Sequence, residues 1–203
     1  AFLLNRSSDL EIHLHLFIIA AILFCGNLVT RAQDNDSVTL YFSAEEMPDL
    51  IKCLPPPPDT IGSDFANDIM RYMWGKQQRN DAERAAFVFQ DAVWNLDSLF
   101  AVFTVPFGLE ITKEGTPEIY KLMVNSLSTI DATRVKPKAF YHRMRPFERF
   151  HEHMLTRYEE AELSGEGSYP SGHSQRGYAT ALLLSEINPD NAATIMSRGY
   201  MYG

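Results

Sequence analysis

The chain has 203 residues, of which 45% are hydrophobic and 22% charged, and its formal net charge at pH 7 is -8. This length and composition suit about one globular domain and exclude collagen-like, low-complexity and intrinsically disordered chains. Two cysteines cannot staple a chain of this length as a disulfide scaffold. The acidic balance argues against a nucleic-acid-binding protein, which needs a surplus of lysine and arginine to neutralise phosphates.

The first feature along the chain is an apolar run from Leu14 to Val29, followed by Thr30-Arg31-Ala32 and then by polar residues. This order is typical of a secretory signal peptide, so we expect residues 1–32 to be a signal and the protein to be periplasmic or secreted. The run is shorter than the roughly 20 apolar residues that span a membrane. We therefore expect no stable membrane insertion after signal removal, with a buried core helix and a membrane anchor as alternatives.

The rest of the chain indicates an arm and then helices. We expect residues 33–62 to form an extended, proline-rich N-terminal arm. Each proline after Leu54 locks its own φ angle and disfavours the helical region for the residue before it. Within it, Ser37 to Phe42 is the one weak strand candidate. Residues 63–203 are expected to form one helical domain.

Capping residues and apolar spacing predict five helices in that domain. They are a helix capped by Ser63 or Asp64 and running through Trp74, a longer one capped by Asn80 or Asp81 and ended by Pro106, one beginning at Thr116-Pro117, one from Ser171 to Ile187, and one from Asp190 to Tyr202. Apolar residues of the second helix fall at three- and four-residue spacing and are expected in the core: Phe89, Ala92, Val93, Leu96, Leu99, Phe100 and Phe103. The predicted fold class is all-α.

Positive charge gathers in one segment of this acidic chain. Between Arg134 and Arg149 lie six bases against a single acid, Glu148. Such a segment favours an anionic partner, although a solvated basic helix face has the same composition.

A second feature precedes the fourth predicted helix, where the chain reads Tyr169-Pro170-Ser171-Gly172-His173. Ser171 can act as the N-cap, and the backbone N–H groups of Ser171 and Gly172 then lie at the positive end of the helix dipole, which favours a phosphate. His173 follows in the first turn. Taken alone, the serine and glycine could be only a cap and the histidine only structural.

Together the two features resemble a known pattern. Lys138, six residues and Arg145-Pro146 are similar to the first motif of the superfamily of type 2 phosphatidic acid phosphatases and vanadium haloperoxidases, and Pro170 to His173 are similar to the second. From Leu54 to Gly203 the chain resembles the class A bacterial nonspecific acid phosphatases. The segments that carry this resemblance are Leu54 to Pro58, Ile119 to Leu122, Gly167 to Tyr169, Ala179 to Leu182 and Glu186 to Pro189.

The resemblance implies a compact helical bundle and a metal-independent enzyme without cofactor that hydrolyses small-molecule phosphomonoesters. It assigns phosphate binding to Lys138, Arg145, Ser171 and Gly172 and the role of general acid to His173. These residue types suit phosphoryl transfer, which is catalysed mainly by positioning and by cations around the equatorial oxygens. The family also implies a possible homo-oligomer, and we expect no nucleic-acid partner.

The family's third motif, which supplies a further arginine, the nucleophilic histidine and its aspartate, is not found. Ser197-Arg198 matches only its first two letters, and we expect this pair to be a decoy on the fifth helix. We therefore expect a C-terminally truncated acid phosphatase that is inactive alone, with a helical bundle that is incomplete at its C-terminus. A non-catalytic phosphate- or polyanion-binding protein and a vanadate-dependent haloperoxidase remain as alternatives.

Overall fold

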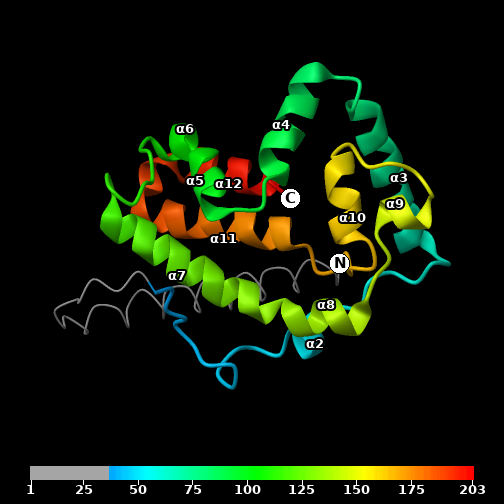
Figure 1. Ribbon diagram of the computed structural model, residues 1–203, viewed down its shortest axis with the longest axis horizontal. Helices are drawn as coiled ribbons and strands as arrows, with labels where there is room; N and C mark the ends of the chain where they lie inside the picture. Colours follow the sequence, from blue (N-terminus) through cyan, green and yellow to red (C-terminus); the bar gives the residue numbers. More distant parts are fainter. Residues whose placement is uncertain (1–36) are drawn as a thin grey trace, which may run out of the picture.

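The computed structural model describes residues 37–203, and every regular element in that range is a helix (Figure 1). The all-α prediction is therefore confirmed. The expected signal peptide and its cleavage site lie outside the described residues. The α-helices are α2 (Leu50–Cys53), α3 (Ser63–Gln78), α4 (Ala82–Ala92), α5 (Leu96–Ala101), α6 (Thr104–Phe107), α7 (Pro117–Thr133), α8 (Val135–Tyr141), α9 (Pro146–Arg149), α10 (Glu160–Leu163), α11 (Gly172–Ile187) and α12 (Ala192–Met201). Short 3-10 turns, η1 (Arg157–Glu159) and η2 (Pro189–Asn191), precede α10 and α12.

The weak strand candidate, Ser37 to Phe42, forms no strand. Its backbone instead bonds to side chains of α7, since the Thr39 N–H donates to Asn125 Oδ1 at 3.0 Å and the Tyr41 N–H donates to Thr129 Oγ1 at 3.0 Å. Alternate N–H groups of an extended segment point the same way, and residues four apart share a helix face. The segment therefore lies along α7 without a partner strand.

The proline-rich stretch after α2 is held by two tyrosines of the helical body. The Tyr169 hydroxyl donates to the Pro55 carbonyl at 2.8 Å, and the Tyr141 hydroxyl donates to the Leu54 carbonyl at 3.3 Å. Because prolines lack a backbone N–H, their carbonyls are the groups left to be bonded. These bonds place the stretch beside the loop that leads into α11.

The first predicted helix is longer than expected and is capped differently. We expected Ser63 or Asp64 as its cap and Trp74 as its end, but both capping candidates lie inside α3, Gly62 is the N-cap, and the helix continues to Gln78. No residue of α3 is buried. Without a buried face to fix its start, this helix is placed by contacts at its surface rather than by packing in the core.

The second predicted helix is in fact three. Asp81 caps α4 as predicted, with its carboxylate accepting from the Arg84 N–H at 3.0 Å. The chain then turns extended at Val93, and Asn95 caps α5 by accepting from the Ser98 N–H at 2.7 Å. The expected single helix up to Pro106 is therefore wrong.

Proline at position 106 lies within α6 and does not end a helix. It occupies the third position of α6, where the missing N–H would have had no partner in any case.

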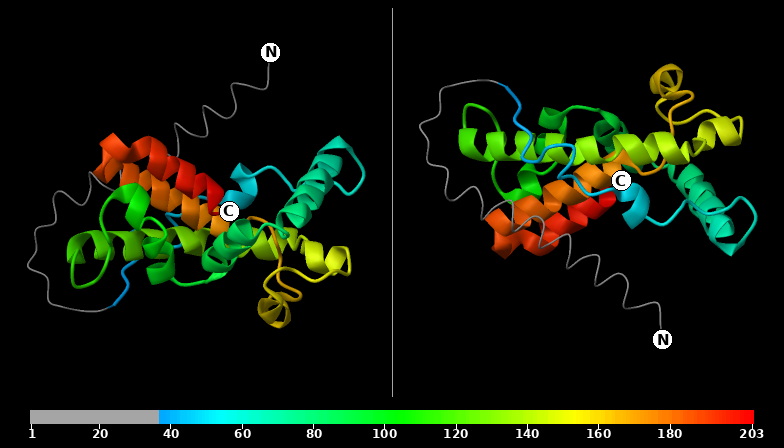
Figure 2. Two further views of the ribbon diagram at one scale, coloured as in Figure 1. Left: turned by 90° about the horizontal axis from the view of Figure 1, so that it is seen from above. Right: turned by 90° about the horizontal axis from the view of Figure 1, so that it is seen from below.

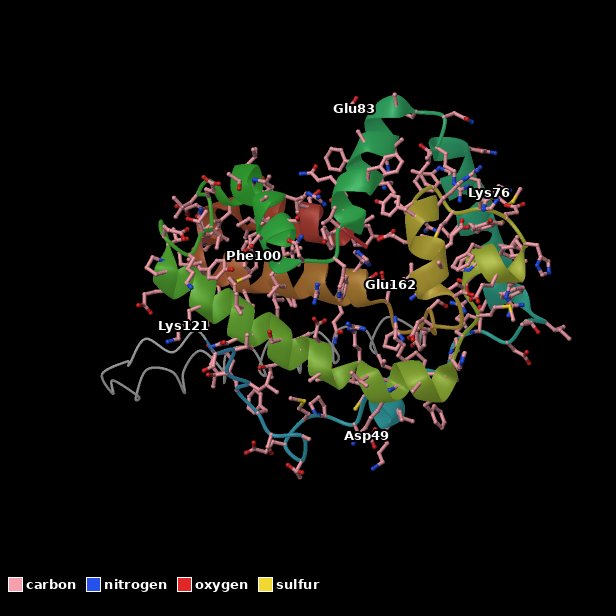
Figure 3. The ribbon with its side chains drawn as sticks, in the orientation of Figure 1. Asp49, Lys76, Glu83, Phe100, Lys121 and Glu162 are labelled. Atoms are coloured by element: carbon pink, nitrogen blue, oxygen red, sulfur yellow. The ribbon has the colours of Figure 1, made fainter. Side chains whose placement is uncertain are left out.

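The break between α4 and α5 also divides the set of apolar residues that we expected in the core. Leu99, Phe100 and Phe103 are fully buried, whereas Phe89 is 41% exposed. Thus α4 leaves the core and projects from the body, with Glu83 near its outer end (Figures 1 and 3).

The core lies between α5, α6, α7, α11 and α12. Two of the remaining predicted starts are confirmed, since α7 begins at Pro117 behind Thr116 and α11 begins behind the N-cap Ser171. The fifth predicted helix, Asp190 to Tyr202, is shorter than expected, since α12 begins at Ala192 after η2 and ends at Met201. Phe100 lies inside this body, edge-on to Tyr120 of α7 at 5.6 Å between ring centroids (Figure 3). The buried apolar residues of the body are Leu99, Phe100, Val102, Phe103, Phe107, Ile111, Met123, Leu127, Ala179, Ala181, Leu182, Leu183, Leu184, Ile195 and Tyr202.

The helices α11 and α12 lie side by side and cross α7 (Figure 2). Their close approach depends on glycines that face each other. A Cβ on Gly177 would lie 2.6 Å from Tyr202 Cβ, and one on Gly199 would lie 2.4 Å from Ala181 Cβ. This packing fixes the N-terminal end of α11 against the C-terminal end of α12, where the site described below lies. Among residues 37–203 no helix is long and apolar enough to cross a membrane.

Candidate active site

A pocket of about 680 Å³ opens between α4, α10 and the N-terminal end of α11. All five residues singled out in the sequence line it, although they come from three separate segments: Lys138, Arg145, Ser171, Gly172 and His173. The pocket therefore brings the basic segment and the serine-glycine-histidine turn together.

Two cations of the pocket, Lys138 and Arg145, lie before and after a sharp turn between the short helices α8 and α9. Lys138 lies in α8, which ends at His142 with a left-handed φ of 41°, and Arg145 is the N-cap of α9. Lys138 Nζ donates to the Pro170 carbonyl at 3.5 Å, and Arg145 Nε donates to the Glu166 carbonyl at 3.0 Å. Both side chains thus lie against the loop that leads into α11.

That loop ends in a well-formed helix cap. Ser171 Oγ accepts from the Ser174 N–H at 3.2 Å and so satisfies one of the free donors of the first turn. Gly172 follows, and a Cβ there would lie 2.8 Å from the Trp94 ring and 3.3 Å from Arg134 Nε. The glycine therefore lets the Trp94 ring and Arg134 pack directly against the first turn of α11.

His173 is held between α4 and α12. Its ring centroid lies 4.8 Å from that of Trp94, edge-on, and 5.8 Å from that of Tyr202. A hydrogen bond to the backbone of Ala92 orients the ring, and Nε2 is buried without any partner. Burial is the main cause that lowers the pKa of His173 below its ordinary value of 6.5, and the bond to Ala92 opposes this shift.

The pocket carries charge of both signs. Burial lowers the pKa of Lys138, and the neighbouring cations Arg145 and Arg134 lower it further. Three carboxylates, Glu159, Glu162 and Glu166, line the same pocket from α10 and its flanking segments. Figure 3 shows Glu162 reaching from α10 toward the N-terminal end of α11. The charge of Glu166 acts on both cations, because it opposes the lowering of the pKa of Lys138 and of Arg145.

Comparison with curated proteins connects this geometry with a known family. The chain is similar to the non-specific acid phosphatase of Providencia stuartii, with 37% identity over 179 residues that cover 88% of this chain and 70% of the relative. It belongs to the family of non-specific acid phosphatases. The corresponding enzyme of Salmonella typhimurium is 29% identical over 184 residues, which cover 90% of this chain and 73% of the relative. An acid phosphatase of Zymomonas mobilis is 31% identical over 147 residues, 72% of this chain and 56% of the relative. No protein-family model matches the chain.

In this acid phosphatase the pair Ser197-Arg198 lies outside the pocket lining. Arg198 is 8% exposed, pairs with Asp91 of α4 and stacks over Phe87 at 5.2 Å from the ring centroid. These contacts give Arg198 a structural task, which is to tie α12 to the base of α4.

Trp94 and Arg134 are among the pocket residues that sequence reasoning did not single out. Arg134 was part of the basic segment, but nothing in the sequence distinguished it from Lys136 or Arg143. Trp94 had no signal at all, because its neighbours follow a continuous helical pattern. Both are placed by contacts with α11, which only the folded chain reveals.

The other described histidines of the phosphatase, His142, His151 and His153, do not line the pocket. Within residues 37–203, no group of three or more histidine, cysteine, aspartate or glutamate side chains is arranged to hold a metal ion. His173 is thus the only described histidine that lines this pocket.

Proposed function

We propose that the pocket binds the phosphoryl group of organic phosphomonoesters and that the site is built for acid phosphatase chemistry without a metal or cofactor. The observation that carries the proposal is the convergence of Lys138, Arg145 and the first turn of α11 on one pocket that also contains His173. The family named above hydrolyses phosphate esters at acid pH, as its name states.

Each residue has a role that its chemistry supports. Arg145 has a planar guanidinium suited to two phosphoryl oxygens, while Lys138 acts as a compact point charge. The N–H groups of Ser171 and Gly172 donate to a third oxygen at the positive end of the α11 dipole. Protonated His173 donates a proton to the oxygen of the leaving alcohol as the phosphorus–oxygen ester bond breaks.

A phosphohistidine route needs a second histidine to attack phosphorus and form the phosphorus–nitrogen bond that water later cleaves. His173 cannot both attack and protonate the leaving group in the same step. No second histidine lines the pocket among residues 37–203, so we propose that these 203 residues have negligible turnover alone. The contributions of catalytic groups that act as a unit are strongly non-additive. The phosphate-binding residues without a nucleophile would therefore bind a phosphomonoester but not hydrolyse it.

We further propose that residues 1–32 direct the protein to the periplasm or the exterior and are then removed. The apolar run and the small residue at position 32 support this proposal. Residues 33–62 would then form the N-terminal arm of the mature protein and residues 63–203 its helical domain.

Inorganic phosphate and vanadate test the binding site without requiring turnover. Either anion should raise the melting temperature by mass action, by an amount equivalent to about 2.7 kcal/mol at a concentration of 100 times Kd. Arg145→Ala should abolish most of this shift, because it removes a charge-assisted contact.

Arg143→Ala is the matched control for that experiment. Arg143 comes from the same basic segment, but it pairs with Asp68 of α3 and does not line the pocket. It should keep the phosphate-induced shift even if its own melting temperature falls. The same shift in Arg145→Ala as in Arg143→Ala would refute the proposed site.

A further inference from the structure

We propose that Arg134 is a third phosphate-binding cation of this pocket, beside Lys138 and Arg145. The inference rests on the proposed function, because it assumes that the pocket accepts a phosphoryl group. Three observations carry it: how Arg134 is held, which of its donors are unused, and what lies next to it.

Arg134 is held at the junction of α7 and α8, where it ends one helix and caps the next. Its Nε donates to Asp131 Oδ1 at 3.2 Å, and its guanidinium lies 5.0 Å from the Trp94 ring centroid. An arginine that is fixed on two sides loses little side-chain entropy when it binds a ligand.

The donors of Arg134 differ from those of its neighbour Arg176. Arg176 uses Nε and Nη2 on the other carboxylate oxygen of Asp131, stacks at 3.4 Å over Trp94 and does not line the pocket. Arg134 bonds through Nε alone, so its two Nη groups donate to no acceptor within residues 37–203. Its side chain is 20% exposed and lines the pocket.

The neighbours of Arg134 are the groups proposed to hold phosphate. Its Nε would lie 3.3 Å from a Cβ on Gly172, so the guanidinium stands beside the backbone of the first turn of α11. Lys138 lies four residues further along the chain, and the charge of Arg134 lowers the pKa of its amine. Three cations that crowd one pocket repel each other, and a bound dianion relieves this repulsion.

A purely structural role is the competing explanation, since Asp131 links Arg134 to α11 through Arg176. The two roles differ in their effect on phosphate affinity. A binding role predicts that removal of the guanidinium weakens phosphate binding. A purely structural role predicts that removal lowers the free energy of unfolding while the phosphate Kd stays the same.

The experiment measures the Kd of the 203-residue chain for inorganic phosphate by calorimetry at pH 6. A hydrogen bond between charged groups is worth about 1.5–3 kcal/mol, so Arg134→Gln should weaken binding by about 10- to 100-fold. Arg134→Lys keeps the charge but loses the paired Nη donors, and it should weaken binding less, by about 3- to 10-fold.

Arg84→Gln is the control variant. Arg84 carries the same charge and also lines the pocket, but it belongs to α4 and also borders a second pocket of about 110 Å³ together with Trp74 and Arg79. Its loss should change the phosphate Kd by no more than about 3-fold, because it lies on α4 and is not among the groups packed against Gly172 in the first turn of α11.

The outcomes separate this inference from the proposed function. Wild-type protein that fails to bind phosphate would refute the proposed function itself. Phosphate binding by the wild type together with equal Kd values for Arg134→Gln and Arg84→Gln would overturn only the role of Arg134. If Arg134→Gln does not fold, as judged by circular dichroism, Arg134→Lys decides, and wild-type affinity in that variant would overturn the inference.

Discussion

The contact between α11 and α12 gives a prediction whose size can be worked out from the coordinates. In Gly199→Ala the new Cβ would lie 2.4 Å from Ala181 Cβ and 2.7 Å from the Gly177 carbonyl oxygen. Carbon atoms in ordinary contact are about 3.5–4.0 Å apart, so the overlap exceeds about 1 Å. Neither neighbour can rotate away, because one is a Cβ atom and the other belongs to the backbone. The two helices must therefore move apart.

The expected cost follows from two opposing effects. Overpacking a close contact costs about 1–3 kcal/mol, and an overlap this large belongs at the upper end of that range. Replacing glycine by alanine inside a helix returns about 1 kcal/mol. We therefore expect Gly199→Ala to lower the free energy of unfolding by about 2 kcal/mol. At about 2–4 °C per kcal/mol for a domain of this size, the melting temperature should fall by about 4–8 °C.

Urea unfolding followed by circular dichroism measures this difference, and Gly75→Ala provides the control. A Cβ on Gly75 of α3 would meet nothing within 4 Å, so that substitution should stabilise the protein by about 0.5–1 kcal/mol. Adding Ala181→Gly to Gly199→Ala removes the closest clash and should recover part of the loss. If Gly199→Ala were as stable as the wild type, the close approach of α11 and α12 described here would be wrong.

Two further predictions concern charges in and beside the pocket. Asp91→Ala leaves Arg198 buried without its partner and should cost about 3–5 kcal/mol in urea unfolding; addition of Arg198→Met should restore most of this, and a loss below about 1 kcal/mol would contradict the pairing. His173 has a folded pKa below its unfolded value of 6.5, so its contribution to stability is fully present above pH 6.5 and is lost as the pH falls through the folded pKa. The free energy of unfolding of His173→Asn should therefore decrease less between pH 7.5 and pH 5 than that of the wild type, and equal decreases would show that His173 is not held in its neutral form.

Local chemistry made the helix starts predictable. Asp81 and Ser171 each precede their helix as the sequence indicated, because a capping side chain bonds to the backbone of its own first turn. The start of α7 was indicated by Pro117, which occupies the first helical position behind Thr116. The start of α3 was not predictable in this way. Gly62 precedes it without a side-chain bond, and Ser63 and Asp64, both good capping residues, lie within its first turn.

Tertiary contacts decided what the sequence could not. The apolar spacing from Phe89 to Phe103 suits one continuous helix, and Asn95 was the only local signal against it. The chain breaks at Val93 to Asn95, and the Trp94 ring packs against the first turns of α11. A residue whose partners lie about 80 positions away in the chain leaves no trace in the local pattern.

The same break also prepares the candidate site. The last carbonyls of a helix have no partner within it, and Ala92 is the last residue of α4. Its backbone is therefore free to bond the ring of His173, which fixes one ring nitrogen and leaves Nε2 without a protein partner. The ring of Trp94, two residues later, packs against the guanidinium groups of Arg134 and Arg176. A continuous helix through residues 92–95 would have used the Ala92 carbonyl internally, so the feature that defeated the helix prediction is the one that orients the proposed general acid.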